Sequence, residues 1–253
     1  MILVEEMTAT SLANRRVLIT GSAGGVGRCV ARNMAEAGAR VLLTDRQNSG
    51  LEQFAGEMKA KGFDVSAVVA DLSDEDGIAE TYQQVDDRLG GLDILVACAG
   101  VGSGPLMEMD DADWRYVIQT NLLSYVACTR AAIDRMRKSE RDDCSLILIG
   151  SISVHIKAVG ESVYNAAKGG VASFAETLRK EMIPEKIRVT LIEPGAIGSA
   201  MQPFSPEERS VMMREHKLLQ PDEVAEAIMF AATRSPGVDV VTLRIEPLDQ
   251  KII

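Results

Sequence analysis

The chain has 253 residues, a length that α/β sheets and barrels reach as one domain. It is 46% hydrophobic and 25% charged, which excludes wholesale disorder, and it holds no apolar run of about 18 residues that would predict a membrane span. The net charge of −10 disfavours a nucleic-acid partner, because an acidic body repels phosphate backbones.

Short β-branched or leucine-rich runs alternate with stretches of helical length along the chain. Strands are predicted at 17–20, 41–44, 65–69, 94–97, 146–149, 189–192 and 238–245. Helices are predicted at 26–37, 51–61, 74–89, 112–138 and 164–183. This alternation implies right-handed crossovers, so we expect a doubly wound α/β Rossmann fold, with a mostly parallel seven-stranded sheet flanked by helices. Residues 1–11 are expected to form a loose arm and residues 12–253 a single domain, with 238–245 as an edge strand.

A glycine cluster, Thr20-Gly21-Ser22-Ala23-Gly24-Gly25-Val26-Gly27, follows the first predicted strand. A tight turn there lets backbone N–H groups approach a pyrophosphate, although such a cluster can also be a simple helix entry. Asp45 ends the second strand, where a carboxylate can accept both ribose hydroxyls of an adenosine or can simply cap a helix. Asp71 and Leu72 end the third strand at the same rim. The pattern predicts a dinucleotide site.

Tyr164-Asn165-Ala166-Ala167-Lys168 places a phenol and an ammonium on one face of a predicted helix. A nearby cation favours the phenolate, so this pair can exchange a proton with an alcohol or ketone near neutral pH. The alternative is an ordinary surface pair. Ser151 ends the fifth strand, thirteen residues before Tyr164, and its hydroxyl could bind a substrate oxygen. This spacing favours the catalytic interpretation.

Together these motifs resemble the short-chain dehydrogenase/reductase family, in its compact single-domain branch, over about residues 15–246. Residues 20–27 match the family motif TGxxxGxG. Ala97-Cys98-Ala99-Gly100 stands where the family has Asn-Asn-Ala-Gly, so an expected sheet-stabilising hydrogen bond is in doubt. Pro194-Gly195-Ala196-Ile197-Gly198-Ser199 resembles the segment that holds the nicotinamide, with Ser199 in place of the usual threonine.

The resemblance implies hydride transfer between a nicotinamide cofactor and a small secondary alcohol or ketone, in a single catalytic domain. Tyr164 would be the acid/base, Ser151 would orient the substrate oxygen, and Lys168 would lower the pKa of the tyrosine and bind the nicotinamide ribose. Asn121 would support a proton relay through a water. Implied cofactor contacts are Gly21, Gly25, Val26, Gly27, Asp45, Arg46, Asp71, Leu72, Ala99, Gly100, Tyr164, Lys168, Pro194, Gly195, Ile197 and Ser199; no metal is expected.

NAD is predicted over NADP, because Asp45 would repel a 2′-phosphate, although Arg46 could turn toward one. Two alternatives stay open. The chain could be a nonenzymatic dinucleotide-binding regulatory module on the same fold. Residues 240–250 also resemble a branch containing 3-hydroxy-acid and clavulanate-type reductases, many of which prefer NADP. The second alternative is therefore an NADP-dependent reductase of the 3-hydroxy-acid or aldehyde type. Lys157 could then pair with a substrate carboxylate, although loop lysines are usually solvated.

Assembly and compartment are also predicted. Family members commonly pair the helices that would here be 112–138 and 164–183, so we expect a homo-oligomer, a homotetramer or a dimer. Four scattered cysteines and the lack of a signal-peptide pattern favour a cytoplasmic protein. Its expected partner is a small-molecule alcohol or ketone, with no nucleic acid and no membrane.

Overall fold

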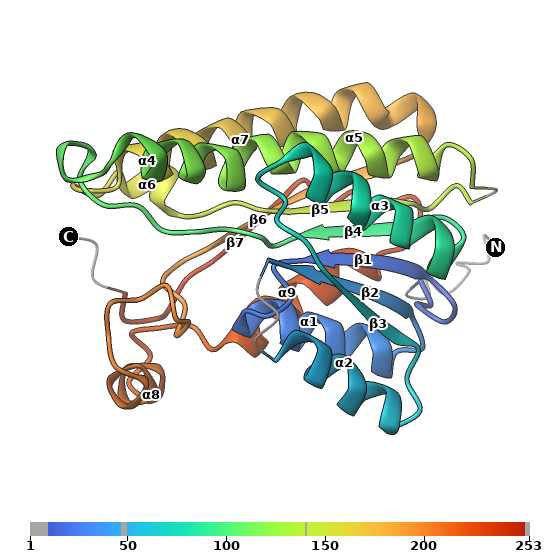
Figure 1. The fold of residues 1–253 in the computed structure, drawn as a ribbon, viewed down its shortest axis with the longest axis horizontal. Coiled ribbons are helices and arrows are strands. Elements are labelled where there is room, and N and C mark those ends of the chain that lie inside the picture. The colour runs from blue at the N-terminus through green and yellow to red at the C-terminus, as the bar shows by residue number, and fades with distance from the viewer. Residues whose placement is uncertain (1–9, 47–49, 140, 251–253) are drawn as a thin grey trace, which may run out of the picture.

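The computed structural model describes residues 10–46, 50–139 and 141–250, and within these ranges seven parallel strands form one sheet with helices on both faces (Figure 1). The strands lie in the order β3-β2-β1-β4-β5-β6-β7. Their bounds are β1 Arg16–Thr20, β2 Arg40–Asp45, β3 Val65–Val69, β4 Ile94–Ala97, β5 Ser145–Ile149, β6 Arg188–Pro194 and β7 Thr242–Ile245. This topology confirms the predicted doubly wound α/β sheet.

Helices cover the two faces of the sheet in separate layers (Figure 1). One layer holds α1 (Gly25–Glu36), α2 (Leu51–Ala60) and α9 (Pro221–Ala232). The other holds α3 (Glu75–Leu89), α4 (Asp111–Ile118), α5 (Ser124–Met136) and α7 (Ser162–Met182). Shorter helices, α6 (Ser153–Ile156) and α8 (Pro206–Arg214), follow β5 and β6, and 3₁₀ turns lie at Leu106–Glu108 and Ile183–Glu185.

Two apolar cores result, one on each face of the sheet. In β1, Val17 and Ile19 are buried against the layer of α1 and α9, whereas Leu18 is buried against α3 and α5. Because both faces are covered, the central strands do not alternate: β4 is wholly apolar, and β1 and β5 are apolar apart from residues at their ends. Packing on both faces therefore holds the strand ends rigidly, which restricts the positions of the residues at those ends.

Three details differ from the sequence prediction. The helix expected over 112–138 is interrupted by a π-helical turn at Gln119–Leu123, between α4 and α5. Only Thr242–Ile245 of the run 238–245 forms a strand, and it lies at the predicted edge beside β6. Helices α8 and α9, in the segment after β6, were not among the predicted helices.

Residues 1–9 of the predicted arm lie outside the described residues. Thr10, the first residue described, donates its N–H to the carbonyl of Thr233 at 2.8 Å and its hydroxyl to the carbonyl of Arg234 at 2.7 Å. Leu12 is buried in the core. In the described parts of the chain, no helix combines the length and the hydropathy that crossing a membrane would require.

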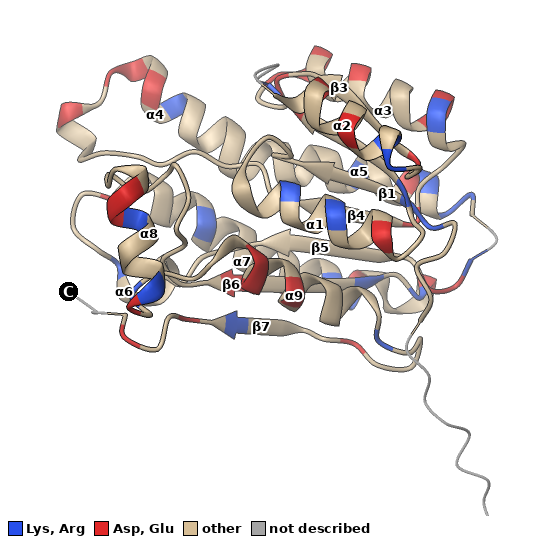
Figure 2. Cartoon of the chain, turned by 90° about the horizontal axis from the view of Figure 1, so that it is seen from below, with Lys and Arg blue, Asp and Glu red and all other residues tan. Residues whose placement is uncertain are grey.

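Acidic side chains gather at the beginnings of several outer helices, as the red segments of Figure 2 show for α4, α8 and α9. The pairs are Asp111 and Asp113 in α4, Glu207 and Glu208 in α8, and Asp222 and Glu223 in α9. Negative charge there compensates the positive end of each helix dipole. Helix α1 has no acidic residue in its first turn and no capping side chain, so its positive end stays available to a ligand.

Candidate active site

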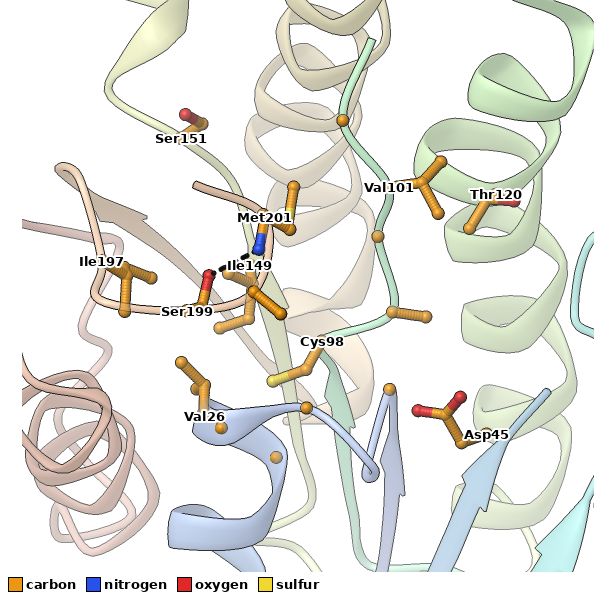
Figure 3. Close-up of a pocket in the computed structure, with 18 of the residues that line it drawn as sticks. Val26, Asp45, Cys98, Val101, Thr120, Ile149, Ser151, Ile197, Ser199 and Met201 are labelled. Atoms are coloured by element: carbon orange, nitrogen blue, oxygen red, sulfur yellow. Dashed lines mark hydrogen bonds between the residues drawn. The ribbon is translucent and has the colours of Figure 1, made fainter. Parts of the chain in front are cut away.

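A cavity of about 630 Å³ runs along the carboxyl ends of the strands, near the point where the strand order reverses between β1 and β4. This is where open α/β sheets generally bind ligands. In the close-up of Figure 3, Asp45 lies at one end of the cavity and Ser151 at the other, with Cys98 on the loop between them. The volume suits a ligand of cofactor size.

The glycine loop between β1 and α1 forms one wall of the cavity. Gly21 has a φ of +66°, and a Cβ there would lie 2.8 Å from the backbone of Ala99, so only glycine fits. A Cβ at Gly27 would lie 2.5 Å from the carbonyl oxygen of Gly21. The loop is therefore folded tightly onto the first turn of α1. Its uncapped N–H groups face the cavity, as a pyrophosphate site requires.

The loop after β4 is tied to this wall by Thr20. Its hydroxyl oxygen accepts the backbone N–H groups of Cys98 and Ala99, both at 3.1 Å. This side chain supplies a hydrogen-bonded link between neighbouring strand ends, which the absence of the two family asparagines had put in doubt.

Asp45, Asp71 and Tyr116 shape the far end of the cavity. The carboxylate of Asp45 accepts the N–H of Ala23 in the glycine loop at 2.9 Å. Tyr116, on α4, donates its hydroxyl to Asp71 at 3.2 Å, and the guanidinium of Arg46 lies 5.1 Å from the centre of its ring. Tyr116 was not predicted, since only the tertiary placement of α4 brings its hydroxyl to Asp71 after the end of β3. These groups make a polar end suited to an adenosine.

The predicted reactive residues meet at the opposite end. Ser151 follows β5, while Tyr164 and Lys168 lie one turn apart in α7, and all three line the cavity. The ammonium of Lys168 is 6.0 Å from the centre of the Tyr164 ring. The structure therefore places these three predicted side chains in the wall of one cavity.

Lys168 is buried, with 3% of its surface exposed, and this burial lowers the pKa of its ammonium to about 8. The ammonium donates to the carbonyl of Ile149 at 2.8 Å and to the hydroxyl of Tyr125 at 3.1 Å. Tyr125 was missed by the sequence interpretation. Its place in α5, four residues after Asn121, puts both residues on one helical face, which is the signal that could have identified it.

Tyr164 does not show the pKa shift expected from a neighbouring cation. Burial raises the pKa of its hydroxyl above 10.0, and the carboxylate of Glu161 adds to the rise, while a hydrogen bond with Ser151 opposes it. No lowering by Lys168 accompanies these effects, and the ammonium donates to Tyr125 and Ile149. In this structure the tyrosine is held in its protonated form at neutral pH.

Asn121 is fully buried in the π-helical turn and does not line the cavity. Its side-chain oxygen accepts the N–H of Val101 at 2.9 Å, and its side-chain nitrogen donates to the carbonyl of Val101 at 2.7 Å. The side chain thus fixes the loop after β4, one helical turn from Tyr125, rather than reaching the cavity.

The segment after β6 closes the cavity opposite the glycine loop. Ile197, Ser199 and Met201 lie on it together in Figure 3, and the N–H of Met201 contacts the Ser199 hydroxyl at 3.4 Å. A Cβ at Gly198 would lie 2.3 Å from the sulfur of Met213, so α8 packs directly on this segment. Met213 thus packs against the segment that closes this side of the cavity.

Every residue predicted to contact the cofactor lines the cavity. The structure adds Ala23, Gly24, Cys98, Val101, Gly102, Tyr116, Thr120, Ile149, Gly150, Ala200 and Met201 to its wall. Among the described residues, no group of three or more His, Cys, Asp or Glu side chains is placed to hold a metal ion.

The sequence profile of the short chain dehydrogenase family matches residues 15–210. The chain belongs to the short-chain dehydrogenase/reductase family. It is 32% identical to the cis-4-hydroxycyclohexanecarboxylate dehydrogenase of Sinomonas cyclohexanicum, over 88% of this chain and 91% of that protein. It is 31% identical to a 3-oxoacyl-[acyl-carrier-protein] reductase of Pseudomonas aeruginosa, over 94% and 97% of the two chains.

Solved structures show the same architecture. The 3-ketoacyl-(acyl-carrier-protein) reductase of Brucella melitensis complexed with NADH superimposes with a TM-score of 0.83 and 27% identity, covering 95% of this chain and 100% of that one. This short-chain dehydrogenase/reductase is thus an NAD(P)-dependent oxidoreductase that acts on CH–OH or keto groups.

Proposed function

We propose that this enzyme transfers a hydride between NAD(H) and a small secondary alcohol or the matching ketone, with Tyr164 as the acid/base. One observation carries the proposal: Ser151, Tyr164 and Lys168 converge at one end of the same cavity whose wall includes the glycine loop. A nonenzymatic regulatory module would need the glycine loop and the polar end, but it would have no use for the three reactive side chains.

The cavity wall fits the cofactor from end to end. The N–H groups at the start of α1 would hold the pyrophosphate, Asp45 the adenosine ribose, and Pro194–Ser199 the nicotinamide. The bound cofactor supplies or accepts the hydride. Two protons of the Lys168 ammonium are committed to Tyr125 and Ile149 among the described residues, which leaves the third for a ribose hydroxyl.

Tyr164 and Ser151 carry the proton chemistry. In reduction, the Tyr164 hydroxyl donates its proton to the substrate carbonyl oxygen as that oxygen becomes an alcohol; in oxidation, the phenolate takes the proton back. Ser151 donates a hydrogen bond to the same oxygen and stabilises the negative charge that develops on it. Burial raises the pKa of Tyr164, so the protonated donor required for reduction is the form present at neutral pH.

NAD is preferred in this proposal because the Asp45 carboxylate lies where a 2′-phosphate would approach. Two like charges at close range repel, and Ala23 and Gly24 of the adjoining loop supply no cation. The guanidinium of Arg46 lies over the ring of Tyr116, which engages this neighbouring cation. An NADP-dependent reductase of the 3-hydroxy-acid or aldehyde type is the alternative, which a higher kcat/KM with NADPH than with NADH would establish.

The substrate end favours an uncharged compound. Val101, Gly102, Ala200 and Met201 form its wall, and among the described residues that line the cavity Arg46 and Lys168 are the only cations. Lys157, the residue considered for pairing with a substrate carboxylate, directly follows α6 and does not line the cavity. A carboxylate would therefore meet no unused cation near Ser151.

A panel of secondary alcohols and ketones, each followed by the absorbance of reduced nicotinamide with both cofactors, tests the function. The proposal predicts turnover of small uncharged ketones with NADH, and weaker turnover of matched keto acids. Binding of NADH without turnover of any member of the panel would favour the regulatory module.

We also propose a cytoplasmic homotetramer, or a dimer, assembled through α5 and α7. Leu123 and Val126, at the beginning of α5, are 54% and 38% exposed, which supports an apolar contact there. The four cysteines are free, as a reducing compartment allows. Light scattering at micromolar concentration tests the assembly, and a monomeric mass would contradict it. Cell fractionation tests the compartment.

A further inference from the structure

The buried ammonium of Lys168 has no carboxylate partner among the described residues. Its hydrogen bonds go to the Ile149 carbonyl at 2.8 Å and the Tyr125 hydroxyl at 3.1 Å. The titratable groups that face it from the other elements are the Cys98 thiol on the loop after β4, Tyr164 on α7 and Tyr125 on α5. Burial raises the pKa of Cys98 to about 12, so this thiol is neutral and cannot balance the charge.

Tyr125 contacts the ammonium in two ways. Its hydroxyl oxygen accepts a proton from the nitrogen, and the centre of its ring lies 4.6 Å from that nitrogen, within range of a cation–π contact. The side chain is 1% exposed and packed in the core between the sheet, α3 and α7. Its position is therefore fixed, and water cannot readily replace its oxygen.

We propose that Tyr125 is a positioning residue for Lys168, whose hydroxyl oxygen and ring hold the ammonium at the cavity wall and keep it charged in the absence of a carboxylate. The proposal rests on the proposed function only for its effect on catalysis. The effect on Lys168 itself follows from the contacts, whatever the enzyme reduces. Tyr125 touches neither the cavity nor the reacting atoms, so it acts through the lysine.

Tyr125→Phe removes the oxygen and keeps the ring. A hydrogen bond from a charged donor changes a protonation equilibrium roughly 10- to 100-fold, so the pKa of Lys168 should fall by about one to two units from its value of about 8. The wild-type lysine is mostly charged at pH 7, whereas the variant lysine would be largely neutral there. Below about pH 6 the lysine is charged in both proteins.

Tyr82→Phe is the matched control. Tyr82 is also buried, 3% exposed, and its hydroxyl donates to the carbonyl of Cys128 in α5, the helix that carries Tyr125. Both variants lose one buried hydroxyl from the same core, but Tyr82 does not contact Lys168. Only Tyr125→Phe should therefore give effects that depend on the protonation of Lys168.

The first measurement is the Tm of the cofactor-free proteins between pH 5.5 and 9.5. The Tyr125 oxygen stabilises the charged lysine, so Tyr125→Phe should lower Tm most at low pH, and the charge-dependent difference from wild type should shrink between about pH 6 and 8, where the variant lysine is losing its proton ahead of the wild-type lysine. Tyr82→Phe should lower Tm by a similar amount at every pH. In a Lys168→Met background, the pH dependence of the Tyr125→Phe effect should vanish.

The second measurement is kcat/KM for a ketone found in the substrate panel. The ratio of Tyr125→Phe to wild type should be near one at pH 6 and fall roughly tenfold by pH 8, because at pH 8 about half of the wild-type lysine is still charged whereas nearly all of the variant lysine is neutral. Equal, pH-independent Tm losses in Tyr125→Phe and Tyr82→Phe would overturn the proposal and leave Tyr125 a core residue. A pH-dependent Tm difference in a protein without turnover would instead leave Tyr125 in this role and reject the proposed function.

Discussion

Replacing Gly27 by alanine would put a methyl carbon 2.5 Å from the carbonyl oxygen of Gly21 and 2.7 Å from the Cα of Ser22. Ordinary contacts of a Cβ begin at 3.4 Å, so the first turn of α1 and the glycine loop would have to separate by about 0.9 Å. Both obstructing atoms belong to the backbone, and no flexible side chain can give way.

The cost follows from two opposing effects. Alanine in a helix interior is more stable than glycine by about 0.5–1 kcal/mol, whereas overpacking costs about 1–3 kcal/mol. We expect a net loss of about 1–2 kcal/mol in the free energy of unfolding. The shift would also misplace the N–H groups at the start of α1, and weaker charge-assisted hydrogen bonds to the pyrophosphate should raise the Kd for NADH about 10- to 100-fold.

Urea unfolding and a fluorescence titration with NADH measure the two effects. Gly56→Ala is the control, because Gly56 lies in the exposed interior of α2 and a Cβ there meets nothing within 4 Å. It should gain about 0.5–1 kcal/mol and leave the NADH affinity unchanged. If Gly27→Ala were as stable as Gly56→Ala and bound NADH with the wild-type Kd, the close packing of the glycine loop on α1 would not be what positions the N–H groups for the pyrophosphate.

Three further changes probe other parts of the molecule. Asp45→Ser should lower kcat/KM for NADH about 10- to 100-fold and raise it for NADPH, whereas an unchanged ratio between the cofactors would refute the role of this carboxylate. Tyr116→Phe should raise KM for NADH with little change in kcat, since it removes only the hydroxyl that contacts Asp71; a loss confined to kcat would contradict this. Burial alone would raise the pKa of the Asp93 carboxyl, but hydrogen bonds from Arg16 outweigh burial and hold that pKa below 3.8. The ion pair therefore stabilises the fold above pH 3.8, and this stabilisation is lost as the pH falls through the lowered pKa. Asp93→Ala should therefore cost about 3–5 kcal/mol at pH 7 in a urea titration, with a smaller difference in acid; a difference that did not vary with pH would count against the ion pair.

The arrangement of the site was predictable to the extent that it depends on strand ends. Parallel strands place their carboxyl ends at one edge, so motifs after β1, β2, β5 and β6 had to meet once the alternating pattern was identified. The four-residue spacing of Tyr164 and Lys168 likewise follows from helix geometry alone. These inferences use only local periodicity and the order of the elements.

What the sequence did not predict depends on how separate elements pack. Tyr125 meets Lys168 because α5 packs over β4, and Tyr116 meets Asp71 because α4 brings its hydroxyl to the end of β3. The direction of the pKa shift of Tyr164 was also missed, because the degree of burial is not visible in a pentapeptide. The hydrogen bonds of Lys168 to Tyr125 and Ile149 are likewise tertiary contacts, which a pentapeptide does not reveal.

The role of Tyr164 as the acid/base is tested most directly by Tyr164→Phe, which removes the hydroxyl and keeps the ring in α7. The measurement is kcat/KM for a ketone with NADH at pH 7, with the Kd for NADH determined on the same protein. We predict a loss of kcat/KM of about 100- to 10,000-fold with an unchanged Kd, since only the proton donor is missing. Turnover in Tyr164→Phe at the wild-type rate would contradict the assignment.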